Sequence, residues 1–330
     1  MTYAAWAPLI AFAVTLVVVE SCTRGRLAQI ALDRPNERSL HATPTPRTGG
    51  LGLHAGFLVA LPVAGFPVPA IVIFSLLGLI AVSAWDDARG LSVFARFTAQ
   101  LLAAGAVSGF FLLTNFGPAV VIACAIGIVW MTNLYNFMDG SDGLAGGMAL
   151  FGFAFYGVAA YVAGNTAFAL LNFSIASAAA AFLVFNFPPA RIFMGDAGSA
   201  PLGFLAACLG LFGWLQNHWA WWFPLLVFSP FIVDASVTLL RRCYRREKIW
   251  QAHRDHYYQR LVRLGWGHRR TALVEYVLMF ACGMAALAGL KWAYSGQVAL
   301  LLTTVVIYSL LIFSAEFAWR KFQAAQDHEA

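Results

Sequence analysis

The sequence predicts an all-α protein that crosses a lipid bilayer many times. Of its 330 residues, 61% are hydrophobic and only 11% are charged, and the mean hydropathy is +0.73. A soluble domain carries about 25% charged residues, so a soluble protein with one anchor does not fit. Apolar runs recur at close to the roughly 20 residues that a helix needs to cross the hydrocarbon core. We therefore expect residues 1–330 to form a single transmembrane domain.

Eleven apolar runs are expected to be membrane-spanning helices. Short turns with Pro, Gly or Asn separate most of them, as at Phe66-Pro67-Val68-Pro69. The first run is expected to be a retained span, because no basic segment precedes it and no small-residue cleavage site follows it. The expected helices cover residues 3–20, 49–66, 68–84, 95–113, 117–136, 144–163, 167–185, 198–216, 219–240, 271–290 and 296–316.

The basic residues predict the orientation of these spans. With eleven spans, 20 of the 21 Lys and Arg residues lie in or beside alternate loops and the C-terminal tail, and only Lys291 lies on the other side. Cytoplasmic loops carry such an excess of basic residues. We therefore expect the N-terminus outside, the C-terminus in the cytoplasm, and every polar motif on the cytoplasmic side.

The overall charge and the cysteines exclude other classes. A net charge of +6 is explained by basic cytoplasmic loops, so no nucleic-acid partner is expected. The five cysteines form no C-x-x-C pair, and three of them lie in apolar runs. Neither a disulfide framework nor a zinc site is therefore indicated.

Asp86 and Asp87 directly follow the third expected span. Carboxylates at membrane depth are costly and mark functional sites by default. Adjacent helical residues point about 100° apart, so one carboxylate could face a cation and the other a basic side chain. A solvated helix end is the alternative interpretation.

A run of polar residues crosses the end of the fifth expected span. Asn133, Asn136, Asp139 and Asp142 recur at every third position, with glycines among them. Steps of three residues drift by about 60° around a helix, so these side chains can meet only if the helix breaks near Asp139. Such a break is tolerated where it lines a cavity or is buried in protein.

Asp196 lies between Gly195 and Gly198 at the start of the eighth expected span. One carboxylate with flanking glycines suits Mg²⁺, which binds one or two carboxylates together with substrate phosphates. The alternative is an aspartate that caps the helix.

The loop from Arg241 to Arg270 holds ten basic residues. Attraction to lipid headgroups accounts for most of the arginines. It does not account for His253 and His256, which lie among aromatic residues and an amide. Recognition of a phosphate-bearing substrate is favoured over a metal site, because no third zinc-type ligand is near. Asp234, about two turns before Arg241, is expected to be a structural partner.

Together these motifs predict phosphoryl transfer at the membrane surface between a nucleotide-activated donor and a lipid acceptor, because that chemistry needs charge neutralisation and in-line positioning. Five motifs carry a resemblance to a known family: Pro46-Arg47-Thr48-Gly49-Gly50, Asp86-Asp87 with Gly90-Leu91-Ser92, residues 136–145, Phe193-Met194-Gly195-Asp196-Ala197-Gly198-Ser199 and residues 253–261. With these motifs the chain resembles the polyprenyl-phosphate N-acetylhexosamine-1-phosphate transferases, glycosyltransferase family 4, over nearly its whole length.

The resemblance implies an enzyme of the bacterial inner membrane that moves sugar-1-phosphate from a UDP-N-acetylhexosamine to undecaprenyl phosphate and releases UMP. It implies Mg²⁺, with Mn²⁺ as an alternative, and leaves a homodimer open. The roles that it implies are as follows: Asp86 and Asp87 are catalytic and act at the lipid phosphate; Asp196 binds the metal; Asn136, Asp139 and Asp142 hold the uridine and sugar-phosphate region; His253 and His256 contact the sugar side; Arg47 and Arg96 clamp phosphates.

The spaced histidines resemble those of the O-antigen and common-antigen branch rather than the peptidoglycan branch, where three histidines are consecutive. Because the second pKa of a phosphate monoester is near 6, the acceptor is already mostly dianionic at neutral pH, and positioning by Asp86 and Asp87 is expected to matter more than proton removal. A phospho-enzyme is the rival scheme. The rival classes are an ion-coupled transporter, which usually places such groups near the midplane, and a CDP-alcohol phosphatidyltransferase, whose aspartate signature is not matched.

Overall fold

The computed structural model describes residues 3–24, 31–33, 44–248 and 253–329, and it is almost entirely helical. The elements are η1 (Tyr3–Trp6), α1 (Ala7–Cys22), β1 (Leu32–Asp33), β2 (Thr45–Pro46), α2 (Gly49–Ala64), α3 (Ala70–Arg89), α4 (Val93–Phe137), α5 (Leu144–Val162), α6 (Thr166–Asn186), α7 (Asp196–Leu215), α8 (Trp222–Val227), α9 (Ser229–Tyr244), α10 (Tyr257–Leu261), a π-helical turn (Val262–Trp266), α11 (Gly267–Gly289) and α12 (Tyr294–Glu329). The all-α membrane fold is thus confirmed.

Every one of the eleven expected spans is helical, but not every one is a separate long helix. In the described part of the chain, eight helices are long and apolar enough to cross a membrane. The fourth and fifth expected spans form the 45-residue α4, which changes direction at Gly117, directly before Pro118. The ninth is divided at Phe228 into α8 and α9, and α2 has only 16 residues. The count of eleven crossings therefore stays a prediction.

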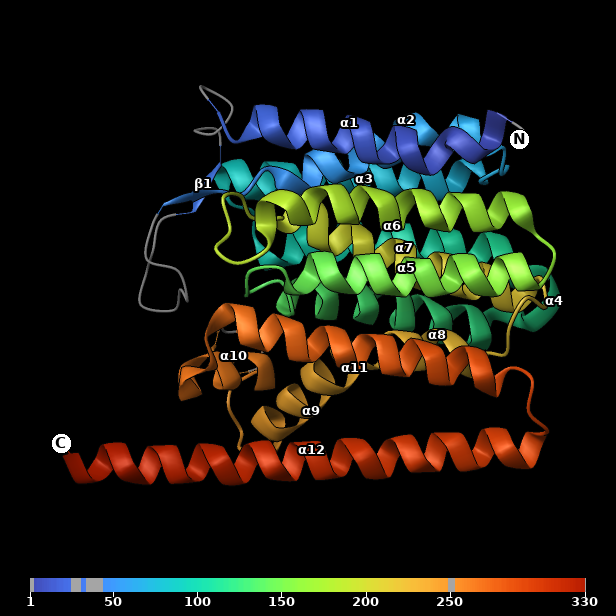
Figure 1. Ribbon diagram of the computed structural model, residues 1–330. Helices are drawn as coiled ribbons and strands as arrows, with labels where there is room; N and C mark the ends of the chain where they lie inside the picture. Colours follow the sequence, from blue (N-terminus) through green and yellow to red (C-terminus); the bar gives the residue numbers. More distant parts are fainter. Residues whose placement is uncertain (1–2, 25–30, 34–43, 249–252, 330) are drawn as a thin grey trace.

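The long helices lie side by side with their axes nearly parallel, and the chain starts and ends at opposite ends of this bundle (Figure 1). β1, which pairs antiparallel with β2, lies at the end where the chain terminates, and so does α10. The loops after α4 and after α6 lie at the same end. One end of the bundle therefore collects the polar motifs, as the alternation of basic loops predicts.

Glycines bring the helices that carry these motifs into backbone contact. A methyl group on Gly50 of α2 would lie 2.2 Å from the Cα of Gly198 in α7. A methyl group on Gly203 of α7 would lie 2.5 Å from the carbonyl oxygen of Met131 in α4. Small residues allow helices in membranes to approach in this way. The start of α7 is therefore held against both α2 and α4.

Candidate active site

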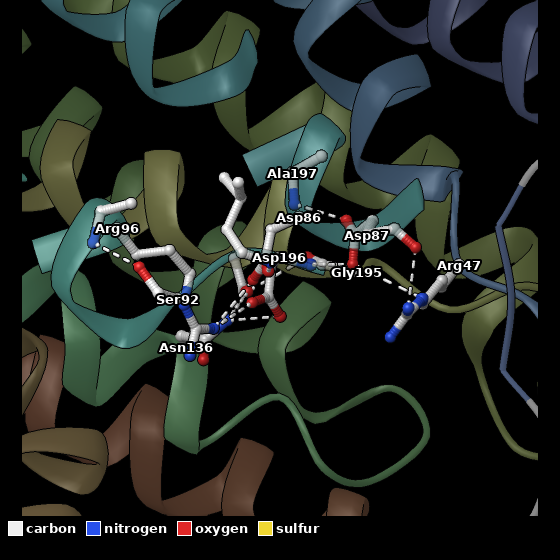
Figure 2. Close-up of polar contacts among 12 residues, drawn as sticks. Arg47, Asp86, Asp87, Ser92, Arg96, Asn136, Gly195, Asp196 and Ala197 are labelled. Atoms are coloured by element: carbon white, nitrogen blue, oxygen red, sulfur yellow. Dashed lines mark hydrogen bonds and ion pairs between the residues drawn. The ribbon is translucent and has the colours of Figure 1, made fainter. Parts of the chain in front are cut away.

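The site lies where α3 and α4 end and α7 begins. Figure 2 shows that Asp86 from α3, Asn136 from α4 and Asp196 from α7 converge there, although they are far apart in the sequence. Arg96, from the first turn of α4, reaches into the same cluster. We call Asp86, Arg96, Asn136 and Asp196 the acidic cluster.

Arg96 bridges the two carboxylates of the acidic cluster. Its Nη1 donates to Asp86 Oδ2 at 2.8 Å and to Asp196 Oδ2 at 3.2 Å. The other oxygen of Asp86 accepts from the Leu91 backbone amide at 2.5 Å, which fixes the carboxylate against the turn after α3. The Asp86 side chain is 11% exposed, whereas those of Asp196 and Arg96 are 32% and 36% exposed. Two carboxylates therefore flank one cation, and solvent reaches the group from the side of Asp196.

Asn136 orients the remaining oxygen of Asp196. Its Nδ2 donates to Asp196 Oδ1 and to Ser199 Oγ, both at 2.9 Å. Ser199 lies one turn along α7 and donates to the Gly195 carbonyl. Asp196 is the first residue of α7, and its side chain turns toward α4 instead of capping the helix. The alternative interpretation of Asp196 as a helix cap is therefore wrong.

Asp87 caps the helix in its place. Its Oδ1 accepts from the Asp196 backbone amide at 3.2 Å, and its Oδ2 accepts from the Ala197 amide at 2.9 Å. The first amides of a helix lack partners within the helix and favour negative charge. Asp87 is 6% exposed, so both oxygens are held inside the protein. The contacts of Asp87 are those of a residue that positions Asp196.

We call the contact between the Asp87 carboxylate and the start of α7 the first clasp. Gly195 permits the first clasp because of its conformation and its lack of a side chain. Its φ is +71°, in the left-handed region that favours glycine. A methyl group there would lie 2.2 Å from the Arg47 carbonyl oxygen and 2.8 Å from Asp87 Oδ2. The glycine beside Asp196 is therefore required by close packing.

Arg47 approaches the clasp from the segment before α2. Its Nη2 donates to the Asp87 backbone carbonyl at 2.7 Å, and its Nε lies 3.5 Å from Asp87 Oδ1. Its side chain is 36% exposed, so the guanidinium still faces solvent. The expected phosphate clamps Arg47 and Arg96 thus lie on either side of the aspartate pair (Figure 2).

Asp139 lies in the turn that follows α4, so the helix breaks where the spacing of the polar residues requires. Its half-buried carboxylate has no hydrogen-bond or ion-pair partner among the described residues. Burial, followed by the nearby carboxylates of Asp196 and Asp87, raises the pKa of Asp139 well above its ordinary value. Asp139 is therefore a carboxylate without a partner among the described residues, and it lies near Asp196 and Asp87.

Asp142 holds loops together. Its Oδ2 accepts from the Ala190 amide at 3.0 Å, and its Oδ1 lies 3.7 Å from Nδ1 of His268 in α11. The preceding Ser141 contacts the same ring nitrogen at 2.9 Å. The described contacts of Asp142 include none with the acidic cluster. Its expected role in donor binding stays a prediction.

His253 and His256 lie beside a second contact of this kind, in which Asp234 holds the start of α10, and we call it the second clasp. Asp234 in α9 accepts from the Tyr257 amide through Oδ1 and from the Tyr258 amide through Oδ2, both at 2.9 Å. His256 is buried, and its Nδ1 lies 3.3 Å from Asp234 Oδ1. The ring of His253 packs on that of His256, with 4.9 Å between centroids. Burial, followed by the nearby His256 and Arg242, lowers the pKa of His253 to about 4, so its ring is neutral at pH 7.

Tyr258 connects the histidines to the turn after α4. Its hydroxyl donates to the Phe137 carbonyl at 3.0 Å, and the space beside Gly140 is filled by the same hydroxyl. The ring of Phe137 stacks on that of His256. The turn after α4 and the histidine segment therefore contact each other next to the acidic cluster. Sequence reasoning gave no role to Ser199 and Tyr258, although both lie in quoted motifs, and it missed His268, because a single Ser, Tyr or His without metal-type spacing carries no signal of its own.

The acidic cluster has the oxygen ligands that Mg²⁺ prefers, in the number that it uses. In the ranges that the structure describes, no three His, Cys, Asp or Glu side chains are placed to hold a metal by themselves. Mg²⁺ commonly takes only one or two carboxylates and completes its shell with water and substrate phosphates. Asp196 with Asp86 fits that pattern, because the two already share one cationic group.

Comparison with known proteins agrees with this geometry. Residues 69–213, which include Asp86, Asn136 and Asp196, match the sequence profile of glycosyl transferase family 4. The chain is 29% identical to a probable undecaprenyl-phosphate N-acetylglucosaminyl 1-phosphate transferase of Bacillus subtilis, covering 92% of this chain and 89% of that protein.

Two further relatives cover most of the chain. A decaprenyl-phosphate N-acetylglucosaminephosphotransferase of Mycolicibacterium smegmatis is 27% identical over 86% of this chain and 80% of its own. A phospho-N-acetylmuramoyl-pentapeptide-transferase of Staphylococcus aureus is 27% identical over 86% of this chain and 97% of its own. All three names describe transfer of a sugar phosphate. Residues 69–213 therefore match glycosyl transferase family 4, and the relatives together with the apolar helices indicate a multi-pass membrane enzyme that transfers a sugar phosphate.

Proposed function

We propose that this enzyme transfers N-acetylhexosamine-1-phosphate from a UDP-sugar to undecaprenyl phosphate, which starts synthesis of an envelope glycan such as O-antigen. An oxygen of the lipid phosphate forms a bond to the phosphorus that carries the sugar. The bond from that phosphorus to the bridging oxygen breaks, and UMP leaves. The observation that carries the proposal is the acidic cluster, in which Asp86 and Asp196 flank the Arg96 guanidinium beside Asn136.

Asp196 would hold Mg²⁺, with Asp86 as the neighbouring carboxylate and Mn²⁺ as an alternative ion. When bound, the ion supplies charge neutralisation for the diphosphate of the donor. Asn136 orients Asp196, and Asp87 holds the start of α7 on which Asp196 stands. These residues move no proton in the scheme, because the acceptor phosphate is already mostly dianionic at neutral pH.

Arg96 and Arg47 would bind phosphate oxygens from opposite sides of the aspartates. Arg96 is 36% exposed and uses one nitrogen, Nη1, for both Asp86 and Asp196, so its other nitrogens would be available to an incoming phosphate. Planar guanidinium groups bind phosphate in two-pronged fashion. Asp139 would face the donor, since its carboxylate lacks a partner among the described residues.

The apolar chain of the acceptor would lie in a groove along α4, α7 and α8. A cavity of about 400 Å³ there extends from Leu134, two residues before Asn136, to Trp214 near the end of α7. Its walls are almost wholly apolar, as in Ile128, Leu211 and Phe228. A lipid in this groove would present its phosphate at the acidic cluster.

The location and the sugar are also part of the proposal. The excess of Lys and Arg in the loops at the site end of the bundle supports a cytoplasmic active site in a bacterial inner membrane. The names of the Bacillus and Mycolicibacterium relatives support UDP-N-acetylglucosamine as the first donor to try. His253, neutral at pH 7, would accept a hydrogen bond from the sugar or donate one to it, rather than offer a positive charge.

The test is a transfer assay with the purified enzyme, undecaprenyl phosphate, Mg²⁺ and a panel of labelled UDP-N-acetylhexosamines. We expect label in the lipid phase, one UMP released for each sugar transferred, and reversal by added UMP. Exchange of UMP into the UDP-sugar without lipid would instead indicate a phospho-enzyme. Transport of a donor without its consumption would contradict the proposal and favour the transporter class.

A further inference from the structure

A second cavity, lined by both charged and apolar side chains, lies away from the acidic cluster, between the end of α9, α10 and the outer helix α12. Its volume is about 590 Å³. In Figure 1 these three elements meet at the end of the bundle where the chain terminates, and α12 forms the edge of the molecule. We call this cavity the α9–α12 groove. The residues that line it are Arg241, Tyr257, Ser309, Ile312, Phe313, Glu316, Phe317 and Arg320.

One end of the α9–α12 groove has an excess of positive charge. Arg241 donates to the Tyr257 hydroxyl at 2.7 Å and to Glu316 at 2.8 Å, and Arg260 donates to the same Glu316 carboxylate at 2.7 Å. Arg320, one turn further along α12, is exposed and pairs with no acidic group among the described residues. Two guanidinium groups therefore share the Glu316 carboxylate, and Arg320 adds a third positive charge to the lining of the groove.

The other end of the groove is apolar. Ser309, Ile312 and Phe313 continue the wall of the groove along α12, on the same helical face as Glu316 and Arg320. The twelve residues from Ser309 to Arg320 span roughly 16 Å at the rise of an α-helix. Phe313 and Phe317 are 70% and 55% exposed. The groove therefore passes from a cationic rim to an apolar wall over a length of about half the hydrocarbon core of a bilayer.

We propose that the α9–α12 groove binds an anionic phospholipid of the surrounding bilayer. Its phosphate would lie between Arg241 and Arg320, and one acyl chain would lie along Ile312, Phe313 and Phe317. The excess of positive charge favours an anionic headgroup over a zwitterionic one, because each basic residue near such a surface contributes attraction. A water-soluble phosphate would leave the apolar wall without a partner. Exposed apolar surface next to a charged rim marks a binding site for a lipid or protein.

The groove is connected to the histidine segment through one residue. The Tyr257 hydroxyl accepts from Arg241 in the groove, while the Tyr257 amide donates to Asp234 in the second clasp. A headgroup on Arg241 would therefore hold the first turn of α10, which follows His253 and His256. Anionic lipid is thus expected to slow hydrogen exchange in residues 253–261.

The experiment compares lipid retention by the full-length protein in mass spectrometry under native conditions, after exposure to phosphatidylglycerol or phosphatidylcholine of identical chains. We expect preferential retention of phosphatidylglycerol, and an affinity about fivefold lower in Arg320→Gln, the loss expected for one basic side chain near an anionic headgroup. Lys248→Gln is the matched control, because Lys248 is exposed and basic but does not line the groove. Its affinity should equal that of the wild type.

A second variant tests the apolar wall. Ile312→Trp fills the part of the groove where the chain would lie, and it should lower retention of both lipids while leaving the charge unchanged. Equal retention of the two lipids by the wild type, or equal losses in Arg320→Gln and Lys248→Gln, would overturn the proposal. A two-copy complex that Ile312→Trp disrupts would overturn it as well, because the groove would then be covered by a second copy of the chain.

Discussion

Two buried aspartates perform the same structural task in different parts of this enzyme. Asp87 accepts from the first two amides of α7, and Asp234 accepts from the first two amides of α10. Each carboxylate comes from another helix and uses both oxygens. Gly195 has no side chain that could cap α7, so the distant carboxylate of Asp87 replaces it, whereas α10 also has a capping box between His256 and Gln259.

The two clasps differ in what they hold. α7 has 20 residues, is packed against α2 and α4 at glycines, and has Asp196 as its first residue. α10 has five residues and leads into a π-helical turn that contains Gly265 with a φ of +89°. The first clasp therefore fixes a rigid reaction site, and the second fixes a short segment with two histidines. The difference teaches that a buried aspartate in a polar motif can position other residues through the start of a helix.

The largest effect is expected from the residue that the first clasp carries. Asp196→Asn should lower the rate of sugar-phosphate transfer on the order of 1,000-fold, because it removes the charge that the cation and Arg96 share. Ser199→Ala, which removes the second acceptor of Asn136 and a hydrogen bond to the Gly195 carbonyl but no charge, should cost much less. The control is the rate of Glu20→Gln, because Glu20 pairs with Arg24 and its described contacts include none with the acidic cluster. Comparable losses in all three variants would contradict this ranking.

Asp87→Asn should lower transfer by about 100-fold, because small displacements of a reacting group have effects of that size. An amide would point NH₂ hydrogens at the Asp196 or Ala197 backbone amide, so one donor loses its acceptor. The apparent melting temperature should therefore fall together with the rate.

A catalytic base would behave differently at this position. In that case Asp87→Asn would retain the melting temperature and lose the ascending limb of the pH–rate profile. Measuring both quantities on the same preparation separates a positioning role from a catalytic one.

Gly195→Ala tests the packing of the first clasp. It combines a positive φ with a methyl group 2.2 Å from the Arg47 carbonyl oxygen, so we expect lower stability and about tenfold lower transfer. Gly65→Ala is matched to it, since Gly65 has a φ of +72° and no atom within 4 Å of an added methyl group. That control should lose only about 1–2 kcal/mol from the strained backbone. Equal behaviour of the two variants would mean that φ alone matters at Gly195.

The sequence predicts much of this arrangement, for reasons that are local. Asp86 and Asp87 are adjacent on a helix and therefore point apart, and the structure places Arg96 against one and Arg47 against the other. The break after α4 follows from the three-residue spacing of Asn136 and Asp139. The lengths of the apolar runs predict where the helices lie, although they do not reveal that α4 continues across Gly117.

The rest depends on contacts between distant segments, which no local pattern encodes. Nothing near Asp87 in the sequence indicates that its oxygens meet the start of α7, 109 residues later. Asp142 has the same motif context as Asp139, yet it contacts Ala190 and His268. His256 is likewise buried against Asp234. The pattern therefore identifies the residues that matter in this region. The tertiary structure then shows which of them hold other segments in place and which lie at the site.

The second clasp should have a smaller effect than the first. Asp234→Asn is expected to raise KM for the donor about fivefold with little change in kcat, because α10 and the histidines shift while the acidic cluster stays in place. Thr238→Val removes a hydroxyl that donates to the same carboxylate at 3.2 Å and should have little effect on KM. A fall in kcat as large as that of Asp87→Asn would mean that the two clasps act on one site.

The smallest expected effect concerns pH and His253. Because the pKa of His253 is lowered to about 4 in the folded protein, its ring stays neutral there while the unfolded chain takes up a proton near pH 6.5. The unfolded state then binds more protons than the folded state, so stability falls as the pH is lowered from about 6.5 toward 4 and is unaffected above that range. His253→Gln should therefore reduce the drop in apparent melting temperature between pH 7 and about pH 5 by a few degrees. An unchanged drop would place the acid sensitivity in another group, and a larger one would mean that His253 becomes protonated in the folded protein.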